Sequence, residues 1–492
     1  MNNIKSGVKH DNERNGAVNG IYIAAAKRNS GKTTVSIALS RIFKNRGLSV
    51  QPFKKGPDFI DSMWLSIASG KKIYNLDFYF MPRNKIKAHF LAHSLGSDIS
   101  IVEGNHGLHD SLDMRGRSSN AEMAKLLGLP VIFLIDVGEL NRGVVPLIRG
   151  FQQFDRDVNI KGIILNKVHS KRHEKNLIRA IHYYTDLKIV GNIPNNLEYS
   201  IKQRHLGLLS TLSSEERENF VADMSSKISD FIDTDSIVKI SKISKKSCSG
   251  VKDLTVLPLN KNKRITRNTV KIGIAYDNAF NFYYNENIEA LERLGCEIIK
   301  FSPLKDAFLP DVDAFYIGGG FPEIFSGELQ ANINIRKEMK RRIEEGIPVY
   351  AECGGLMYLC KSISYENNFH EMVGAIDADV KFTKKPKGHG YTKLSPFFYD
   401  RKEGLWFNKI KSIKGHEFHH SFIDMPSGII GDLVFDVKKG FGVNGTGDGI
   451  AYKNVLAGYT HIYSASSSGW FKNWVAFIKK TKTVSQKGEF LT

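Results

Sequence analysis

The stretch Pro348-Val349-Tyr350-Ala351-Glu352-Cys353-Gly354-Gly355-Leu356-Met357 is the point around which the chain is organised. A short apolar run ends at Cys353, and two glycines precede a segment with helical spacing, so the stretch predicts a strand, a tight turn and a helix start. We expect Cys353 at the apex to be lifted into solvent, where the N–H groups and dipole of the helix N-terminus favour its thiolate. The alternative is a buried cysteine at the end of a strand.

The length and composition set the broad class of protein. A chain of 492 residues is too long for one hydrophobic core, so we expect two or three domains. Residues 1–19 are polar and charged, which predicts a disordered tail rather than a secretory signal, and no apolar run is long enough to span a membrane. The four cysteines show no metal-type pairing, which favours a cytoplasmic location.

The net charge is strongly positive. The chain has 70 basic and 51 acidic residues, a formal charge of +19. Such a balance raises nucleic-acid binding as a hypothesis. However, the lysines are scattered along the whole chain, as a Lys/Ile/Asn-rich composition or an anionic small-molecule substrate would explain. We therefore expect neither a nucleic-acid partner nor a membrane.

Apolar strands alternate with helical stretches in the first half of the chain. We expect strands at residues 20–26, 48–53, 98–103, 131–136, 162–166 and, more weakly, 188–190. A loop at 27–34 and a helix at 35–45 follow the first strand. This alternation predicts an α/β domain at 20–234, with right-handed βαβ units and a parallel sheet covered on both faces.

The second half begins after a change in composition. Residues 235–268 are rich in Ser, Lys and Asn, which predicts a linker, although 254–259 also suits an edge strand. A second α/β domain is expected at 269–492, with strands at 270–276, 314–317 and 349–353.

The loop Ser30-Gly31-Lys32-Thr33-Thr34 lies between a predicted strand and a predicted helix. In a nucleotide-binding P-loop, backbone N–H groups hold phosphates, the lysine reaches the terminal phosphates and the hydroxyl ligates Mg²⁺. The first glycine of the usual spacing is replaced by Ala26. Because the strand and helix flank the loop correctly, we expect nucleotide binding rather than a structural turn.

Acidic residues follow two of the predicted strands. Asp58 and Asp61 come after the second strand, Glu103 ends another, and Asp110 lies just beyond it. The carboxyl edge of an open α/β sheet is where ligands bind, and Mg²⁺ takes one or two carboxylates besides phosphate oxygens. Glu103 with Thr33 is the expected metal pair. For the three aspartates the alternative is turn capping.

Histidines are weaker candidates in the first domain and stronger ones in the second. His106 and His109 lie beside Asp110, where they also suit a solvated loop. A thiolate nucleophile needs a base, and the second domain offers four histidines, each with a structural role as its alternative: His416, His419, His420 and His461. Gly318-Gly319-Gly320 after a strand is positioned to give N–H donors for an oxyanion.

The motifs together resemble the cobyrinic acid a,c-diamide synthase family. The matching segments run from about residue 20 to the last helix and are the Ser-Gly-Lys-Thr-Thr loop, 55–61, 75–77, 102–104, 107–110, 318–323, 351–355 and 415–419. The resemblance implies a dethiobiotin-synthetase-like P-loop ATPase domain followed by a class I glutamine amidotransferase domain of flavodoxin-like fold.

The resemblance also implies the chemistry. Cys353, assisted by His461, would take ammonia from glutamine through a thioester, with Gly319 and Gly320 at the oxyanion and glutamine. ATP with Mg²⁺ would phosphorylate two acetate carboxylates of a tetrapyrrole in turn, and ammonia would displace each phosphate. The implied roles are ATP binding for Ser30, Gly31, Lys32, Thr33 and Thr34, metal binding for Thr33 and Glu103, and carboxylate and phosphate chemistry for Asp58, Asp61 and Asp110.

The sequence departs from the family pattern in three places. Tyr463 stands where class I amidotransferases usually carry a Glu. The family that the chain resembles is known to lack this Glu, so the departure fits it, and what orients His461 stays open. The phosphate loop lacks the usual glycines at residues 25–30. Residues 63–64 and 105–113 look closer to a sirohaem amidase branch that acts in sulfur oxidation, so cobyrinate, hydrogenobyrinate and sirohaem all stay open as substrates.

A different class of function also fits the phosphate loop. A regulatory or partitioning ATPase would share it, with a non-catalytic amidotransferase-like domain, but the intact elbow at Cys353 disfavours this hypothesis. The ammonia route between the domains and the oligomeric state, including a homodimer, stay open.

Overall fold

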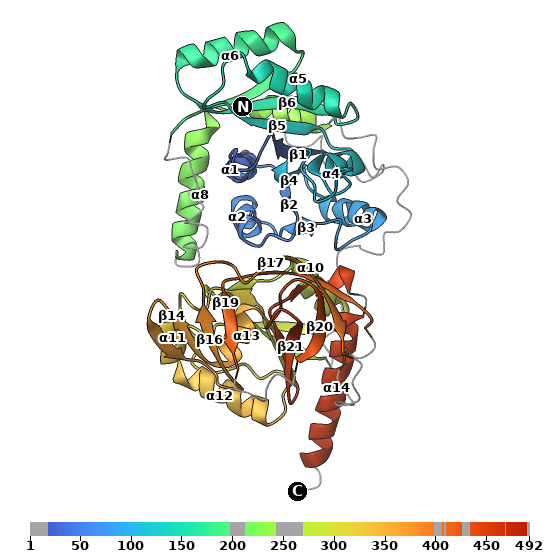
Figure 1. Cartoon of the computed structure of the whole chain (residues 1–492), viewed down its shortest axis with the longest axis vertical. Coiled ribbons are helices and arrows are strands. Elements are labelled where there is room, and N and C mark those ends of the chain that lie inside the picture. The colour runs from blue at the N-terminus through green and yellow to red at the C-terminus, as the bar shows by residue number, and fades with distance from the viewer. Residues whose placement is uncertain are drawn as a thin grey trace, which may run out of the picture. The chain divides into compact units, whose positions relative to one another are not determined.

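The structure is a computed structural model, and it describes residues 18–196, 212–242, 269–397, 406–407, 410–425, 433–467 and 469–489. The chain divides into two compact units, Met1–Pro258 and Leu259–Thr492 (Figure 1). The predicted tail up to residue 17 and the predicted strand at 254–259 lie outside the described residues. Within the described part of the chain, no helix combines the length and apolar character needed to cross a membrane.

The N-terminal unit is built on one parallel sheet. Its seven strands have the order β3-β2-β4-β1-β5-β6-β7, and every neighbouring pair is parallel. The strands are β1 (Gly20–Ala25), β2 (Val50–Lys55), β3 (Tyr74–Leu76), β4 (Ile99–Gly107), β5 (Val131–Asp136), β6 (Ile160–Val168) and β7 (Lys188–Pro194). The parallel sheet predicted from the alternating pattern is confirmed, and the short strand β3 is an addition to it.

Helices cover both faces of this sheet. Figure 1 shows α1, α2 and α8 on one side and α3 and α4 on the other. The helices are α1 (Lys32–Asn45), α2 (Ile60–Ser69), α3 (Arg83–Ser94), α4 (Asn120–Leu127), α5 (Val144–Phe154), α6 (Lys171–Tyr184), α8 (Ser214–Ser229) and α9 (Thr234–Ser241). The helix predicted from residue 35 therefore begins at Lys32, so Lys32–Thr34 form the first helical turn rather than a loop.

Helix α9 corrects the predicted start of the linker at residue 235. The Asp233 side chain accepts a hydrogen bond from the backbone N–H of Ser236 and caps the helix, and Ile237 and Ile240 are buried in the core of the sheet. Two isoleucines three positions apart are enough to attach this helix to the core, although Ser and Lys dominate the composition around them. Residues 243–268 of the predicted linker lie outside the described residues.

The C-terminal unit contains a ten-stranded mixed sheet with the order β10-β8-β11-β13-β22-β21-β20-β17-β18-β23. The first five strands of this order are parallel and the pairs beyond β22 are antiparallel. Its strands are β8 (Lys271–Ala275), β10 (Glu297–Phe301), β11 (Ala314–Ile317), β13 (Val349–Glu352), β17 (Gly388–Pro396), β18 (Ile413–His419), β20 (Leu433–Lys439), β21 (Gly447–Tyr452), β22 (Val455–Gly458) and β23 (His461–Ile462).

Two smaller sheets complete this unit. One pairs β9 (Phe280–Phe282) with β12 (Gly319–Gly320). The other has the order β15-β14-β16-β19 and consists of β14 (Cys360–Tyr365), β15 (Asn368–Glu371), β16 (Ile376–Phe382) and β19 (Ser421–Asp424). The helices are α10 (Asn285–Arg293), α11 (Ser326–Ala331), α12 (Ile333–Glu344), α13 (Gly354–Leu359), α14 (Trp470–Glu489) and the short 3-10 turn η4 (Ser464–Ser466).

Alternating residues of β11 and β13 divide the core of this unit into two layers. Tyr316 and Tyr350 pack with α14, where the Tyr350 and Trp474 rings lie 5.8 Å apart. Phe315 and Val349 face the opposite layer, which contains α12 and α13. Side chains that alternate along a strand point to opposite faces of its sheet. Glu352 and Cys353 at the end of β13 therefore belong to different faces, and this places the candidate site described below.

Candidate active sites

The phosphate loop has the backbone that nucleotide binding requires. Gly31 caps helix α1 with a φ of 93°, and a Cβ atom at this position would lie 2.5 Å from Nδ2 of Asn166. That amide donates to the carbonyl of Ser30 at 2.8 Å and holds the loop against β6. Lys32 is buried, which lowers its pKa to about 8. Lys32 and the backbone N–H groups at the N-terminus of α1 thus lie next to each other, where both can bind a phosphate group.

The predicted metal pair lies together. Oγ1 of Thr33 donates to Oε1 of Glu103 at 2.9 Å, and Glu103 has no exposed surface. Lys54 on β2 donates to the same Oε1 at 2.7 Å and to Oδ2 of Asp61 at 2.5 Å. Because Lys54 is enclosed by carboxylates, its pKa is raised well above its usual value despite burial. Strands β2 and β4 are neighbours, which explains why these distant residues meet.

The residues around Glu103 fit a divalent cation. Oε2 of Glu103 is buried and has no hydrogen-bond partner within the described residues. A buried carboxylate oxygen without a hydrogen-bond partner lowers the stability of the fold unless a cation or a hydrogen-bond donor contacts it. No three His, Cys, Asp or Glu side chains in the described part of the chain are arranged to hold a metal by themselves. A cation here would therefore need oxygen atoms from a ligand, as Mg²⁺ bound to ATP has.

Two of the three aspartates also serve the turns in which they lie. Oδ1 of Asp58 accepts the N–H of Asp61 at 2.7 Å, and Oδ2 of Asp110 accepts the N–H of Gly107 at 2.8 Å. Burial and the neighbouring Asp61 raise the pKa of Asp58 to about 7. The turn-capping alternative is thus present in the structure for Asp58 and Asp110, and capping still leaves the second oxygen of each carboxylate for a ligand.

The two histidines near Asp110 have different surroundings. His109 stacks on Phe151 of α5 with ring centroids 5.5 Å apart, whereas His106 is exposed. Partial burial lowers the pKa of both side chains. Neither histidine has a hydrogen bond to Thr33, Glu103 or Lys54 in the described structure, so they are not part of that cluster.

The predicted strand–turn–helix around Cys353 is confirmed. Cys353 lies between β13 and α13 with φ 48° and ψ −101°, a left-handed conformation that is strained for a residue with a side chain. A Cβ atom at Gly355 would lie 2.2 Å from the carbonyl oxygen of Ile317, and one at Gly354 would lie 3.0 Å from the Gly320 nitrogen. Both glycines are therefore required by close backbone approach, as in a nucleophile elbow.

The expectation that the Cys353 thiol is lifted into solvent is wrong. The residue is only 4% exposed, and burial raises the pKa of its thiol well above the usual value. The carboxylate of Glu323 raises this pKa further. The reason for the burial is the small sheet, because β14, β16 and β19 contribute side chains to the same space. Cys353 is thus both a buried cysteine and the apex of an elbow.

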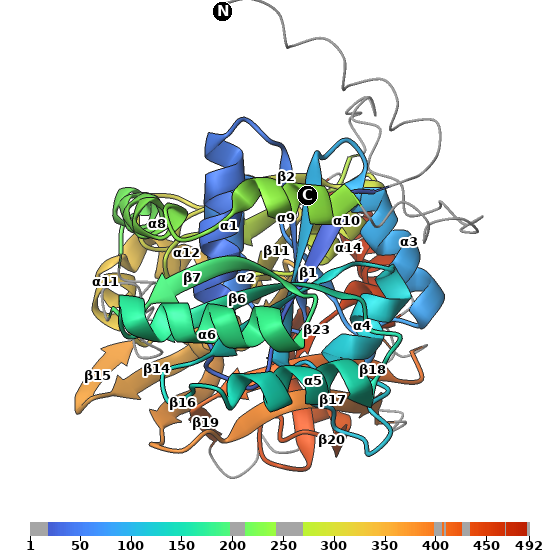
Figure 2. The same cartoon turned by 90° about the horizontal axis from the view of Figure 1, so that it is seen from above.

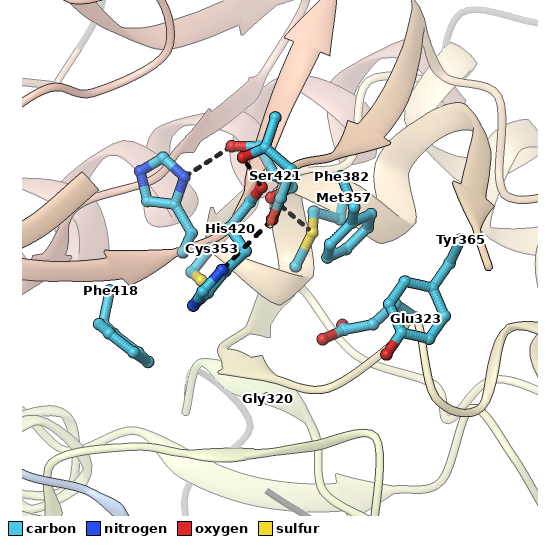
Figure 3. Close-up of a pocket in the computed structure, with 11 residues that line it drawn as sticks. Gly320, Glu323, Cys353, Met357, Tyr365, Phe382, Phe418, His420 and Ser421 are labelled. Carbon is cyan, nitrogen blue, oxygen red and sulfur yellow. Dashed lines mark hydrogen bonds between the residues drawn. The ribbon is translucent and has the colours of Figure 1, made fainter. Parts of the chain in front are cut away.

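A pocket opens beside the thiol (Figure 3). Its volume is about 320 Å³, which is at the lower end of the ~300–1,000 Å³ found for small-molecule sites. The pocket is lined by Gly320, Glu323, Cys353, Met357, Tyr365, Phe382, Thr383, Phe418, His419, His420 and Ser421. A nucleophile in the wall of a pocket of this size is suited to attack on a small substrate.

Two of the four candidate bases, His419 and His420, have hydrogen-bond partners, and a third, His416, is a weak base. Burial lowers the pKa of His416 to about 3, which makes it a weak base. The ring of His419 stacks on the ring of Tyr459 with centroids 3.6 Å apart, and the Nδ1 atom of His419 lies 2.8 Å from the carbonyl oxygen of Ser421. His420 lines the pocket, and its Nδ1 lies 3.3 Å from the carbonyl of Thr383.

His461 lies against the diglycine that adjoins the elbow. A Cβ atom on Gly319 would be 2.3 Å from Cε1 of His461, and the next residue, Gly320, contacts Gly354. The N–H of Cys353 donates to the carbonyl of Gly458 at 2.7 Å, which joins the two segments directly. His461 is not in the wall of the pocket, whereas His419 and His420 are. We favour His461 because it is next to the elbow backbone, and this leaves His420 as the competitor.

The three glycines proposed as N–H donors for the oxyanion differ in their hydrogen bonds and in their distance from the pocket. The N–H of Gly318 donates to the hydroxyl of Tyr283 at 2.7 Å and is already engaged. Gly319 and Gly320 form β12, and Gly320 borders the pocket. A Cβ atom on Gly320 would lie 2.0 Å from the carbonyl oxygen of Ala279, so only glycine fits. The structure thus brings Gly320 to the site, with Gly319 beside His461.

Comparisons with known proteins identify two domains, and each of them contains one of the two candidate sites. Residues 21–208 match the CobQ/CobB/MinD/ParA nucleotide binding domain, and residues 271–469 match the CobB/CobQ-like glutamine amidotransferase domain. The chain is 37% identical over 467 residues to the cobyrinate a,c-diamide synthase of Magnetococcus marinus, which covers 95% of this chain and 98% of the relative. It is 39% identical to that of Methanobrevibacter smithii, over 91% of this chain and 96% of the relative.

The chain belongs to the cobyrinate a,c-diamide synthase family. Its fold is a P-loop nucleotide-binding domain followed by a glutamine amidotransferase domain, as the sequence predicted. The chain is therefore a glutamine-hydrolysing ligase.

The structure of this family member identifies two residues that the sequence did not single out. Lys54 lies between Glu103 and Asp61. The feature of the sequence that could have indicated its role is a lysine within the strand β2, all of whose residues are buried. Glu352 precedes the nucleophile, and its Oε2 lies 3.8 Å from Nδ1 of His461. The signal for Glu352 was a carboxylate at the end of an apolar strand.

Glu352 is held in place by several donors. It accepts hydrogen bonds from the hydroxyls of Tyr316, at 2.9 Å, and Tyr350, and from the N–H of Ile462 at 2.9 Å. Tyr463, which replaces the usual Glu, instead packs edge-on against Tyr284 in the core with centroids 5.0 Å apart. A carboxylate fixed beside Nδ1 favours a proton on that nitrogen and leaves Nε2 as the base.

Proposed function

We propose that the chain amidates the a and c acetate carboxylates of cobyrinic or hydrogenobyrinic acid, with ATP and glutamine as co-substrates, in cobalamin biosynthesis. The relatives of nearly equal length are named for this reaction. The observation that carries the proposal is that one chain contains both a phosphate loop next to a carboxylate cluster and an elbow cysteine next to a small pocket. Each amide formed consumes one carboxylate, one ATP, one glutamine and one water, and yields ADP, phosphate and glutamate.

Ammonia is released at the elbow. Sγ of Cys353 attacks the side-chain amide carbon of glutamine after His461 has taken the thiol proton. The developing oxyanion faces the backbone N–H groups of the Gly319–Gly320 segment. His461 returns the proton to the leaving nitrogen, a glutamyl thioester remains, and water hydrolyses it to glutamate. Glu352 keeps His461 in the productive tautomer.

The carboxylate is activated at the phosphate loop. A substrate carboxylate oxygen attacks the γ-phosphorus of ATP, ADP leaves, and ammonia then displaces phosphate from the acyl phosphate. Lys32 and the N–H groups of the loop hold the phosphates, and Asp58, Asp61 and Asp110 position the carboxylate and ammonia. Glu103 and Thr33 would hold Mg²⁺, which neutralises phosphate charge when bound.

The sirohaem alternative depends on two departures, and the structure separates them. Trp64 is buried in α2 and packs on Phe220 with centroids 5.3 Å apart, and Met63 contacts Arg217. Met63 and Trp64 thus both pack against α8, whereas in the second departure, residues 105–113, the side chain of Leu112 is 82% exposed. Mass spectrometry of the product after each macrocycle is offered with ATP, Mg²⁺ and glutamine distinguishes the substrates.

The replacement Cys353→Ala tests the glutamine half of the proposal. We expect glutamine-driven amidation to be abolished while free ammonia still supports it, because the variant keeps the whole phosphate-loop site. The measurement is product formation with each nitrogen source. Glutamine use by the variant would refute the role of Cys353, and loss of both activities would show that the variant is misfolded or that the thiol acts elsewhere.

The replacement Glu103→Gln tests the ATP half. Removal of the carboxylate charge should lower Mg²⁺-dependent amidation about 100-fold or more with either nitrogen source, because phosphate charge is no longer neutralised at this position. Glutamine hydrolysis by the other unit serves as the control for folding. Unchanged amidation would mean that another residue holds the metal.

A further inference from the structure

Glu323 is a half-buried residue in the wall of the glutaminase pocket, and the mechanism above gives its carboxylate no task. It follows Gly320 in the loop after β12. Its Oε2 atom is buried and has no hydrogen-bond partner within the described residues. In the view of Figure 3, Glu323 and Tyr365 lie on one side of the pocket, and Cys353 and His420 lie on the other. The carboxylate thus borders the space that the thiol also borders.

The pocket supplies no strong cation to this carboxylate. Its lining residues include no lysine and no arginine, and the two histidines in the lining pair with backbone carbonyls through Nδ1. Burial raises the pKa of Glu323 to about 7, which shows that the surroundings do not compensate a negative charge. A buried charge without a partner is a cost to the folded protein unless a ligand brings the opposite charge.

We propose that Glu323 receives the α-ammonium group of glutamine and so selects an amino-acid amide over a simple amide. The proposal depends on the glutamine hydrolysis proposed above. Glutamine has its amide and its ammonium group at opposite ends of a short chain. A pocket with a nucleophile on one side and a lone carboxylate on the other matches that arrangement. The charge-assisted hydrogen bond formed there belongs to the stronger class of polar contacts.

The same contact links substrate binding to the nucleophile. Burial is the main cause of the raised pKa of the Cys353 thiol, and the negative charge of Glu323 raises this pKa further, so the thiol stays protonated while the pocket holds no cation. An ammonium group placed at Glu323 offsets that charge and lowers the cost of forming the thiolate. Glutamine therefore increases the reactivity of the thiol that attacks it, and the resting enzyme is protected from unproductive reactions of Cys353.

The test compares glutamine with glutaramate, which is glutamine without its α-amino group. In the wild-type chain, kcat/KM should be much higher for glutamine. In Glu323→Gln this preference should fall about 10- to 100-fold, mainly through KM for glutamine, while glutaramate hydrolysis is unchanged or increased. Glu328→Gln on the exposed side of α11 is the matched control and should keep the wild-type preference.

Three outcomes decide the proposal. An unchanged preference in Glu323→Gln, or an equal loss for both amides, overturns it. If the variant hydrolyses neither amide, Glu323→Asp decides, because a retained charge should restore a preference for glutamine and a continued loss for both amides overturns the proposal. In the resting chain, Glu323→Gln should also make Cys353 react faster with iodoacetamide. Failure of the proposed function would appear separately, as glutamine use by Cys353→Ala.

Discussion

The two sites of this chain bury ionisable groups in opposite ways. At the phosphate loop, the buried Lys54 is enclosed by Glu103 and Asp61, so opposite charges meet before any ligand arrives. At the elbow, Cys353 has the carboxylates of Glu323 and Glu352 nearby, and the pocket lining contains no lysine or arginine. The first site holds a buried cation among its carboxylates, whereas the lining of the second includes no such cation and, in our proposal, receives one from its substrate.

This difference has a physical consequence for how each site responds to change. Removing one partner of a balanced buried pair leaves the other charge uncompensated, and the fold itself loses stability. Removing a carboxylate from the elbow relieves an unfavourable charge, so the fold is spared and recognition or rate changes instead.

The largest effect is expected from the base at the elbow. His461→Ala should lower glutamine hydrolysis about 10²- to 10⁴-fold, because the thiol of Cys353 has a raised pKa and cannot ionise without a base. His420→Ala should lower it only severalfold. Ammonia-driven amidation should be unchanged in both variants. The reverse order of effects would make His420 the base.

The next largest effect is expected at the phosphate loop. Lys54→Met should lower the free energy of unfolding of the N-terminal unit by about 3–5 kcal/mol, because the buried Glu103 and the half-buried Asp61 lose the cation that they share. Chemical denaturation measures this loss. Lys55→Met is the matched control, since Lys55 donates to the neutral amide oxygen of Asn105 at 3.1 Å, and about 1 kcal/mol is expected there. Equal losses in the two variants would contradict the charge balance.

A smaller effect is expected from the residue that orients the base. Glu352→Gln keeps the size of the side chain and most of its hydrogen bonds, and should lower glutamine hydrolysis about 10- to 100-fold. The loss should show mainly in kcat, because the orientation of the His461 ring towards the thiol is affected. A change in KM alone would assign Glu352 to structure rather than to the base.

The smallest effect concerns pH. The pKa of Asp58 is raised to about 7, from about 4 in an unfolded chain, so its stabilising contribution is present at low pH and is lost as the pH rises towards 7. Relative to wild type, Asp58→Asn should gain about 1–2 kcal/mol of unfolding free energy between pH 5 and pH 8. Denaturation at both pH values measures this gain. The exposed control Asp157→Asn should show no such gain.

The sequence was most informative where backbone constraints are local. Gly31, Gly354 and Gly355 are each required by a close contact or a left-handed φ, so the loop and the elbow could be recognised from adjacent residues. The parallel sheet of the first unit followed from apolar strands that alternate with helical periods. Helix α9 was missed because two isoleucines among serines and lysines are a weak signal.

The surroundings of the reactive groups could not be predicted because they come from distant segments. Cys353 is buried by β14, β16 and β19, whose residues follow it by seven to seventy-one positions. Lys54 and Glu103 meet only because β2 and β4 are neighbours in the sheet. Sequence patterns identify which residues react, but their charge states depend on tertiary packing.

The proposed orienting carboxylate and the proposed nucleophile are consecutive residues, Glu352 and Cys353. His461 lies just after β22, which pairs in parallel with β13 and aligns Gly458 with Glu352. All three groups are thus supplied by two adjacent segments, 349–354 and 455–462. The relative position of these three groups therefore depends on one pair of parallel strands, so a shift of register between β13 and β22 would displace His461 from both Glu352 and Cys353.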